Sequence, residues 1–168
     1  EKKDSQGVCF VGQIKLKDFL AQRIPIEKGP IVTEEGKQVG MHDGVSFYTI
    51  GQRQGLGLSG GPFYVAQKDA KTNTLVVTKD SFKLDENECA IRDINWISGE
   101  EPELPLKVLV KIRYQSSSIP ATLYKIQDTR YKTVFDTPAR ALAIGQCAVF
   151  YLPSDLSAET LVKTEALL

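Results

Sequence analysis

The sequence has few of the residues that bind metals or form disulfide bonds. Its 168 residues include one histidine, one methionine, one tryptophan and three cysteines. The cysteines are Cys9, Cys89 and Cys147, far apart in the chain and without a Cys-x-x-Cys pair. A structural zinc site needs about four closely spaced ligands, so no metal is expected. In a reducing compartment three such thiols stay free.

Long apolar runs and an overall charge are lacking as well. No apolar stretch approaches the roughly 20 residues that span a bilayer. The opening "EKKDSQG" is not followed by the apolar core of a signal peptide. We therefore expect a protein of the cytoplasm with no membrane partner. The 21 basic residues balance the 21 acidic ones, which excludes a strong general attraction to nucleic acid.

What the chain does contain is a pattern of short strands. The segment "QIKLKDFLAQRI" has apolar residues at helical spacing and predicts one short helix before Pro25. Elsewhere, β-branched and aromatic residues alternate with polar ones, which is typical of strands. Strands are predicted on both sides of the turn Glu35-Gly36 and in "VSFYTI", "PFYVAQKD", "TLVVTKD", "CAIRDINWI", "KVLVKIRYQ", "IPATLYKI", "YKTVFD" and "CAVFYL".

These strands make the fold class mainly β, with a small barrel and a sandwich both open as architectures. Charge divides the chain, because residues 80–103 hold eight acidic and two basic side chains, whereas residues 104–140 hold seven basic and two acidic ones. On charge alone, two ordinary solvated surfaces explain this pattern as well as a functional difference between the segments does. The acidic segment "DSFKLDENE" is the best candidate boundary between two small units. Cys89 and Cys147 lie within strand patterns and are interpreted as small core residues.

The segment "GQRQGLGLSGG" holds five glycines in eleven residues and predicts a loop. It matches neither the phosphate-binding GxxxxGK[ST] pattern nor the dinucleotide-binding GxGxxG pattern. Strands are expected on both sides, so no helix N-terminus is available to hold a phosphate group. A structural turn is the favoured interpretation, with Arg53 as a candidate RNA contact.

Two residues remain as candidates for catalysis. His42 has no Ser or Asp near it in a triad pattern, so it is interpreted as a surface or packing residue rather than a base. Cys9, in "KKDSQGVCFVGQ", is either a buried filler or a reactive thiol. Gly7 gives the backbone unusual freedom, and Lys2 and Lys3 would lower the pKa of the thiol if the loop folds back toward them.

Six segments occur in one order: "KKDSQGVCFVGQIKLKDFL", "GMHDGVSFYTIGQRQGLGL", "PFYVAQKDAKTNTLVV", "INWI", "KIRYQ" and "GQCAVFY". Together they resemble the C-terminal half of the tRNA-specific 2-thiouridylase family, whose members replace the C2 oxygen of the wobble uridine with sulfur. The resemblance extends from Glu1 to about Tyr151.

The resemblance implies roles for particular residues. Cys9 matches the cysteine that carries the persulfide intermediate and is the expected catalytic residue. The residues that match tRNA contacts are Arg113, Tyr114 and Gln146, and Arg53 and Lys111 are further candidates for RNA contact. One basic face is expected from Lys111, Arg113, Lys125, Arg130 and Lys132.

The resemblance also implies an arrangement of domains. Residues 1–81 would form a small, β-rich central adaptor domain with one short helix, carrying the Cys9 loop. Residues 82–168 would form a translation-factor-type β-barrel that contacts tRNA. After Tyr151 the sequence departs from the family's usual ending. The segment "SAETLVKTEALL" is therefore either a helix capped by Ser157 or a divergent last strand.

The family's ATP-binding domain, with its Ser-Gly-Gly-x-Asp-Ser pyrophosphatase loop, is not found in this sequence. The expected whole enzyme is an ATP-dependent tRNA sulfurtransferase supplied with sulfur by a relay protein or a cysteine desulfurase. This chain would be the part that provides the persulfide cysteine and tRNA contacts. It is expected to bind no cofactor and to be inactive alone. The alternative is a non-catalytic RNA-binding or adaptor barrel derived from the same scaffold.

Overall fold

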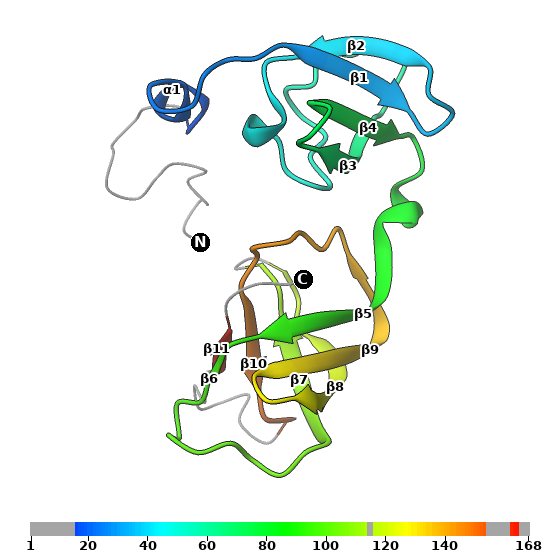
Figure 1. Ribbon diagram of the computed structural model, residues 1–168. Coiled ribbons are helices and arrows are strands. Elements are labelled where there is room, and N and C mark those ends of the chain that lie inside the picture. The colour runs from blue at the N-terminus through cyan, green and yellow to red at the C-terminus, as the bar shows by residue number, and fades with distance from the viewer. Residues whose placement is uncertain (1–15, 114–115, 154–161, 165–168) are drawn as a thin grey trace, which may run out of the picture. The chain divides into compact units, whose positions relative to one another are not determined.

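The computed structural model describes residues 16–113, 116–153 and 162–164, which consist mostly of strands joined by short turns (Figure 1). The mainly β fold class is thereby confirmed. Two compact units are present, and the division lies between Asp80 and Ser81. No helix within the described ranges is long and apolar enough to cross a membrane. Cys9 and Tyr114 lie outside these ranges.

The first unit contains the one short helix and a four-stranded sheet. Its elements are α1 (Leu16–Ala21), β1 (Gly29–Thr33), β2 (Gln38–His42), β3 (Tyr64–Asp69) and β4 (Thr74–Thr78). The sheet order is β2-β1-β4-β3, with β1 and β4 parallel and the other neighbours antiparallel. The predicted helix, the hairpin at Gly36 and the pair of strands after the glycine loop are all found.

The core of the first unit forms on one face of this sheet. Side chains alternate across a strand, so Leu75 and Val77 point to the same side of β4. Both are almost completely buried. The other members of this core are Ile31, Val45, Tyr48, Leu56, Phe63 and Val65. Four of them come from the segment between β2 and β3, so this long connection belongs to the core.

The predicted strand "VSFYTI" is wrong, because a 3-10 turn, η1 (Val45–Phe47), occupies its first half. Val45 and Tyr48 are both buried although they are three residues apart. A 3-10 turn has three residues per turn and places both on one side, whereas a strand would place them on opposite sides. The Val45 N–H donates to the Asn73 side-chain oxygen at 3.2 Å, in place of a strand partner.

The second unit is a closed barrel. It begins with a 3-10 turn, η2 (Ser81–Leu84), and continues with β5 (Asp85–Arg92), β6 (Ile94–Asn95), β7 (Leu106–Lys111), β8 (Ile119–Gln127), β9 (Arg130–Arg140), β10 (Ala148–Tyr151) and β11 (Val162–Thr164). The sheet order is β5-β9-β8-β7-β10-β11-β6. Only Asp93, with φ of 57°, separates β5 from β6. One chain segment thus supplies both ends of the sheet, which closes on itself.

The barrel interior is filled by alternating apolar side chains. Val108, Val110 and Ile112 are buried on one side of the β7 segment, as the alternation in "KVLVKIRYQ" predicts. They pack with Leu123 of β8 and Phe150 of β10 in one core. The strand alternative for the chain's tail is the one found at Val162–Thr164, since β11 pairs with both β10 and β6.

The two described cysteines differ in their surroundings. Cys89 packs against the barrel core, as predicted, and burial raises the pKa of its thiol to about 12. Cys147 is exposed, so its prediction as a core residue is wrong. It immediately precedes β10, where Ala148 and Phe150 take the buried positions. The alternation therefore turns residue 147 outward.

Candidate functional site

The barrel end at which β7 finishes and β10 starts brings two predicted contact residues together. Lys111, the last residue of β7, lies opposite Val149 of β10 in the antiparallel ladder. The chain reaches Arg113 just beyond β7 and Gln146 just before β10. Residues 33 positions apart in sequence therefore lie on neighbouring segments, because the two strands pair antiparallel.

Arg113 is exposed, yet its position is fixed by several hydrogen bonds. Its Nη2 donates to the Ala141 carbonyl oxygen at 3.1 Å. Its backbone N–H donates to the Ser116 hydroxyl at 3.2 Å, and that hydroxyl donates to the Arg113 carbonyl at 2.8 Å. A guanidinium carries five N–H donors in a rigid fork. The contact with Ala141 orients this fork at the barrel end, where phosphate oxygens would fit it.

Gln146 holds the loop that follows β9. Its side-chain oxygen accepts from the Ala143 N–H at 3.3 Å, and its Nε2 donates to the Ile112 carbonyl at 3.2 Å. Its backbone N–H also donates to the Ala143 carbonyl at 3.1 Å. Gln146 thus closes a tight turn and ties that turn to the segment that carries Arg113. The first role visible in the structure is to position this loop.

Ile144 is a feature of this end that sequence reasoning missed. It lies at the tip of the turn that Gln146 closes, and its side chain is 84% exposed. The available signal in the sequence was an isoleucine next to a glycine in a gap between two predicted strands. In the structure, Gly145 has φ of 82°, as expected of a glycine in a tight turn. The barrel end therefore presents an oriented guanidinium and an apolar tip on adjoining segments, which suits contact with an RNA backbone and with sugar or base surfaces.

The five residues of the predicted basic face do not form one face. Leu106 pairs with Leu123 and Val110 with Ile119, so Lys111 and Lys125 lie toward opposite ends of the β7–β8 pair, about 20 Å apart at strand spacing. Lys125 also pairs with Glu101 at 2.7 Å, and Lys132 pairs with Glu88 at 3.2 Å. The β8–β9 hairpin carries Lys125, Arg130 and Lys132 and places these charges toward the barrel end opposite Arg113.

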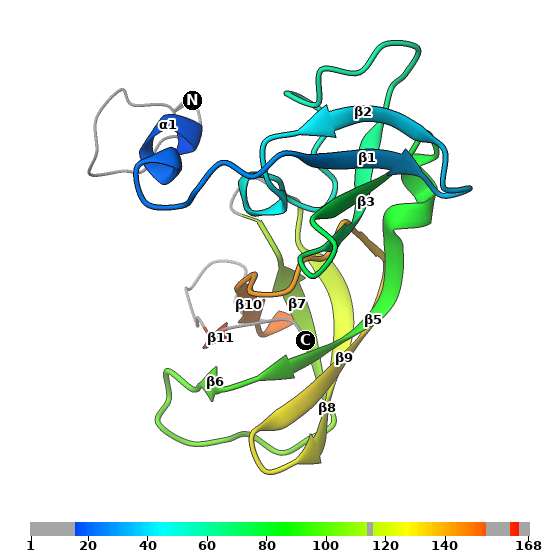
Figure 2. The same ribbon diagram turned by 45° about the horizontal axis from the view of Figure 1, so that its top comes forward.

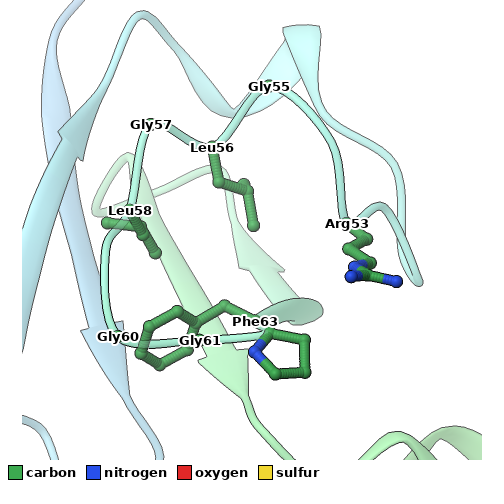
Figure 3. A pocket seen from close by; sticks show the side chains of 9 residues that line it. Arg53, Gly55, Leu56, Gly57, Leu58, Gly60, Gly61 and Phe63 are labelled. Atoms are coloured by element: carbon green, nitrogen blue, oxygen red, sulfur yellow. The ribbon is translucent and has the colours of Figure 1, made fainter.

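Arg53 lies in the first unit, on the glycine loop, and is exposed (Figure 3). The loop borders a hollow of about 310 Å³. It connects η1 to β3, so no helix starts where the loop ends. The loop therefore lacks the helix N-terminus that commonly holds nucleotide phosphates, and its residues do not fit a cradle for the triphosphate of ATP.

His42 proves to be a packing residue. It is 2% exposed, and its ring lies edge to face with that of Tyr48. Its Nδ1 accepts from the Gly44 N–H at 2.9 Å, so the hydrogen of the neutral ring is on Nε2, 3.0 Å from the Asn73 carbonyl oxygen. Burial lowers the pKa of His42 below its ordinary value of 6.5. Both ring nitrogens are engaged with backbone, so this histidine is not presented to a substrate.

Among the described residues no group of three or more His, Cys, Asp or Glu side chains could hold a metal ion. Comparison with protein families gives two matches. Residues 17–79 match the family described as "tRNA methyl transferase PRC-barrel domain", and residues 86–156 match the "Aminomethyltransferase beta-barrel domain". One match thus falls in each compact unit.

Comparison with curated proteins finds relatives with one recurrent name. The tRNA-specific 2-thiouridylase MnmA of Mannheimia succiniciproducens is 42% identical over 159 residues, which cover 90% of this chain and 41% of the relative. Its namesake in Pasteurella multocida is 42% identical over 90% of this chain and 42% of the relative. MnmA 2 of Geobacillus kaustophilus is 41% identical over 89% and 42%, respectively. The chain therefore spans about two fifths of the length of the curated relatives it matches.

Proposed function

Because the chain belongs to the tRNA-specific 2-thiouridylase family, we propose that it serves in the ATP-dependent thiolation of C2 of the wobble uridine in tRNA. Its part in this reaction is to supply the persulfide cysteine, Cys9, and contacts to tRNA. The reaction takes place in the cytoplasm. The proposed role is a part of the reaction, because the chain matches about two fifths of the length of each relative.

The observation that carries the proposal is the joint placement of Arg113 and Gln146 at one end of the barrel. Both residues were expected to contact tRNA, and the fold brings them onto neighbouring segments joined through Ile112 and Ala141. Arg113 presents an oriented cation to a phosphate, while Gln146 fixes the loop beside it. Tyr114, which lies outside the described residues, follows Arg113 directly and would add stacking or a hydrogen bond.

Cys9 also lies outside the described residues, and its role follows from the resemblance of the segment around it. A persulfide has a nucleophilic, transferable terminal sulfur, while the protein retains the inner sulfur. A sulfur-relay protein or cysteine desulfurase would supply the terminal sulfur. The target uridine must leave its stack to be reached, as bases do in other base-modifying enzymes.

ATP use is assigned to the region of the relatives that this chain does not match. Among the described residues, the glycine loop is the segment closest in composition to a cradle for the triphosphate of ATP, and it lacks the helix N-terminus that such a cradle uses. We therefore expect no thiolation by this chain alone. Incubation with ATP, tRNA and a radiolabelled sulfur donor should give no labelled tRNA, and turnover under these conditions would contradict the assignment.

A titration of tRNA with the chain tests the barrel contact. Arg113→Ala should weaken binding by fivefold or more, on the scale of a lost charged hydrogen bond. Arg130→Ala is the matched control, because it removes the same charge at the other end of the barrel and should change affinity by less than twofold. Equal losses in the two variants would show a general charge effect and contradict a local contact.

The second candidate function is a non-catalytic RNA-binding or adaptor barrel. It is favoured because Arg113 and Gln146 at the barrel end belong to this chain, whereas no ATP cradle is found among the described residues. Incubation with a cysteine desulfurase and cysteine separates the two. A gain of one sulfur atom on Cys9 by mass spectrometry, absent in Cys9→Ser, supports the thiolation role, whereas an unmodified Cys9 favours the adaptor.

A further inference from the structure

The glycine loop of the first unit is held rigidly at both ends and along its apolar side. At its ends, the Gly51 N–H donates to the Val65 carbonyl at 2.8 Å, and the Val65 N–H donates to the Gln52 carbonyl at 3.0 Å. Within the loop, Leu56 is buried in the core. Leu58 packs closely over Gly40 of β2, where a Cβ would lie 2.5 Å from the leucine methyl. The loop is thus an anchored element of the fold.

Its backbone, by contrast, has unused donors. Among the parts of the chain that the structure describes, no group accepts a hydrogen bond from the N–H groups of residues 53–61. Gly55, Gly57 and Gly60 all have φ between 67° and 77°. Such left-handed residues set between ordinary ones are typical of concave runs of N–H groups that bind anions.

The hollow beside this backbone combines apolar walls with positive charge. It has a volume of about 310 Å³, and Leu56, Leu58 and Phe63 contribute to its lining. Figure 3 shows Leu58 and Arg53 on opposite flanks, with the Leu56 side chain extending into the space that the loop encloses. No acidic residue occurs in residues 51–63, although the chain has 21.

We propose that this hollow binds one nucleotide unit of RNA, with the phosphodiester held by Arg53 and the loop N–H groups and the nucleoside against the apolar walls. The inference rests on the proposed function and deepens it, because it gives the first unit a tRNA contact of its own. The contact reads no sequence, since backbone amides and Arg53 address the phosphate and the apolar walls accept any base or sugar.

An RNA nucleotide fits this lining better than a protein segment does. A peptide brings both N–H donors and carbonyl acceptors, whereas the loop and Arg53 offer donors to an acceptor-rich partner. The volume is at the lower end of the range for small-molecule pockets, about 300 Å³, which suits a single nucleotide.

Gly57 provides a direct test, since a Cβ there would meet no protein atom within 4 Å. The methyl group of Gly57→Ala therefore stands where the ligand approaches the backbone. Gly36→Ala is the matched control, because Gly36 also has a positive φ, 81°, and open space around it, in the β1–β2 turn. Both substitutions impose the same kind of backbone strain, and only the first obstructs the loop.

The experiment follows backbone amide NMR signals of the isotope-labelled chain during titration with a hexauridylate. Saturable shifts are expected for residues 53–61. Affinity should fall about tenfold in Gly57→Ala and in Arg53→Gln, the scale of a charged hydrogen bond, and less than twofold in Gly36→Ala. A parallel arm uses inorganic phosphate, and another measures tRNA binding by the Arg113→Ala variant.

Each outcome decides between the proposals. Loop signals that do not move with hexauridylate, while tRNA binding still depends on Arg113, would overturn the loop site and leave the proposed function standing. Loop shifts with no effect of Arg113→Ala on tRNA binding would keep the loop site and contradict the barrel contact. Equal shifts with inorganic phosphate at the same concentration would overturn the assignment to RNA, and equal losses in Gly57→Ala and Gly36→Ala would reduce the effect to strain.

Discussion

At the scale of single residues, His42 shows how burial fixes a protonation state. Its neutral ring accepts one hydrogen bond from the Gly44 N–H and lies within hydrogen-bond distance of the Asn73 carbonyl. Protonation would put a second N–H against the Gly44 N–H and a charge into a nearly fully buried position. The lowered pKa of His42 is thus a property of this packing.

This arrangement predicts a pH dependence of stability. The pKa of His42 is lower in the folded state than its ordinary 6.5, so the unfolded chain binds the proton more readily. The contribution of neutral His42 to the free energy of unfolding is complete above about pH 6.5. It is lost as the pH falls toward the pKa of the folded state, by up to ~1.4 kcal/mol per pH unit. Urea unfolding at pH 7.5 and 5.5 measures it. Because the sequence has a single histidine, His42→Gln should flatten the slope, and an unchanged slope would contradict this account.

The two described cysteines give a second residue-scale prediction. Burial raises the pKa of Cys89 from 9.0 to about 12, so the reactive thiolate is about a thousandfold scarcer at a given pH. Maleimide labelling of the native chain, read by mass spectrometry, should modify exposed Cys147 rapidly and Cys89 only upon unfolding. Comparable rates for the two in the native chain would show that the barrel opens locally near β5.

At the scale of elements, Gly29 lets β1 pass close to its neighbours. A Cβ at this position would lie 1.9 Å from the Asn73 carbonyl oxygen and 2.8 Å from the His42 Nε2. The same oxygen is the one that lies opposite the His42 ring nitrogen. The first residue of β1, the end of β2 and the β3–β4 turn thus meet at one point where only a glycine fits.

Gly29→Ala should therefore destabilise the first unit by about 3 kcal/mol, at the upper end for overpacking. Chemical denaturation followed by a probe of this unit measures the loss. Gly36→Ala serves as the control, since it meets no atom within 4 Å and costs only the strain of its positive φ, about 1 kcal/mol. Equal losses of unfolding free energy in the two variants would mean that the turn carrying Asn73 moves aside at little energetic cost, which would contradict the close-contact account.

Elements also show where prediction from the sequence succeeds. Alternation in the β7 segment predicted both the strand and its buried face, with Val108, Val110 and Ile112 on one side, because a period of two is typical of a strand. "VSFYTI" alternates as well, but its hydrogen bonds go to the Asn73 side chain and to its own turn. Asn73 is distant in sequence, and the turn depends on φ at Gly44, so a local pattern of residues does not predict either partner.

At the scale of the whole molecule, the candidate site depends on topology. The sequence supplied Arg113 and Gln146 separately, and the pairing of β7 with β10 brings them together. The same topology separates Lys125 from Lys111, which the distribution of charge along the chain did not indicate. The roles of the two units, and those of Cys9 and Tyr114, stay predictions.

The balanced charge of the chain predicts a modest salt dependence of tRNA binding. With no net charge, long-range attraction is weak, and in our proposals the local cations Arg53, Lys111 and Arg113 make the contacts. For three to four phosphates the logarithm of the binding constant should fall with that of salt concentration with a slope of about −3. Fluorescence anisotropy at several salt concentrations measures this slope, and a value near zero would contradict both RNA proposals.

Closure of the barrel has a consequence for its biosynthesis. The ring is completed by Val162–Thr164, which pairs with β6 from the start of the unit. When synthesis has reached the end of β10, the sheet is therefore still open, and its edge strands β10 and β6 each lack the partner that β11 later provides. Such edges invite strands from neighbouring nascent chains, so the synthesis of Val162–Thr164 protects the barrel strands made before it.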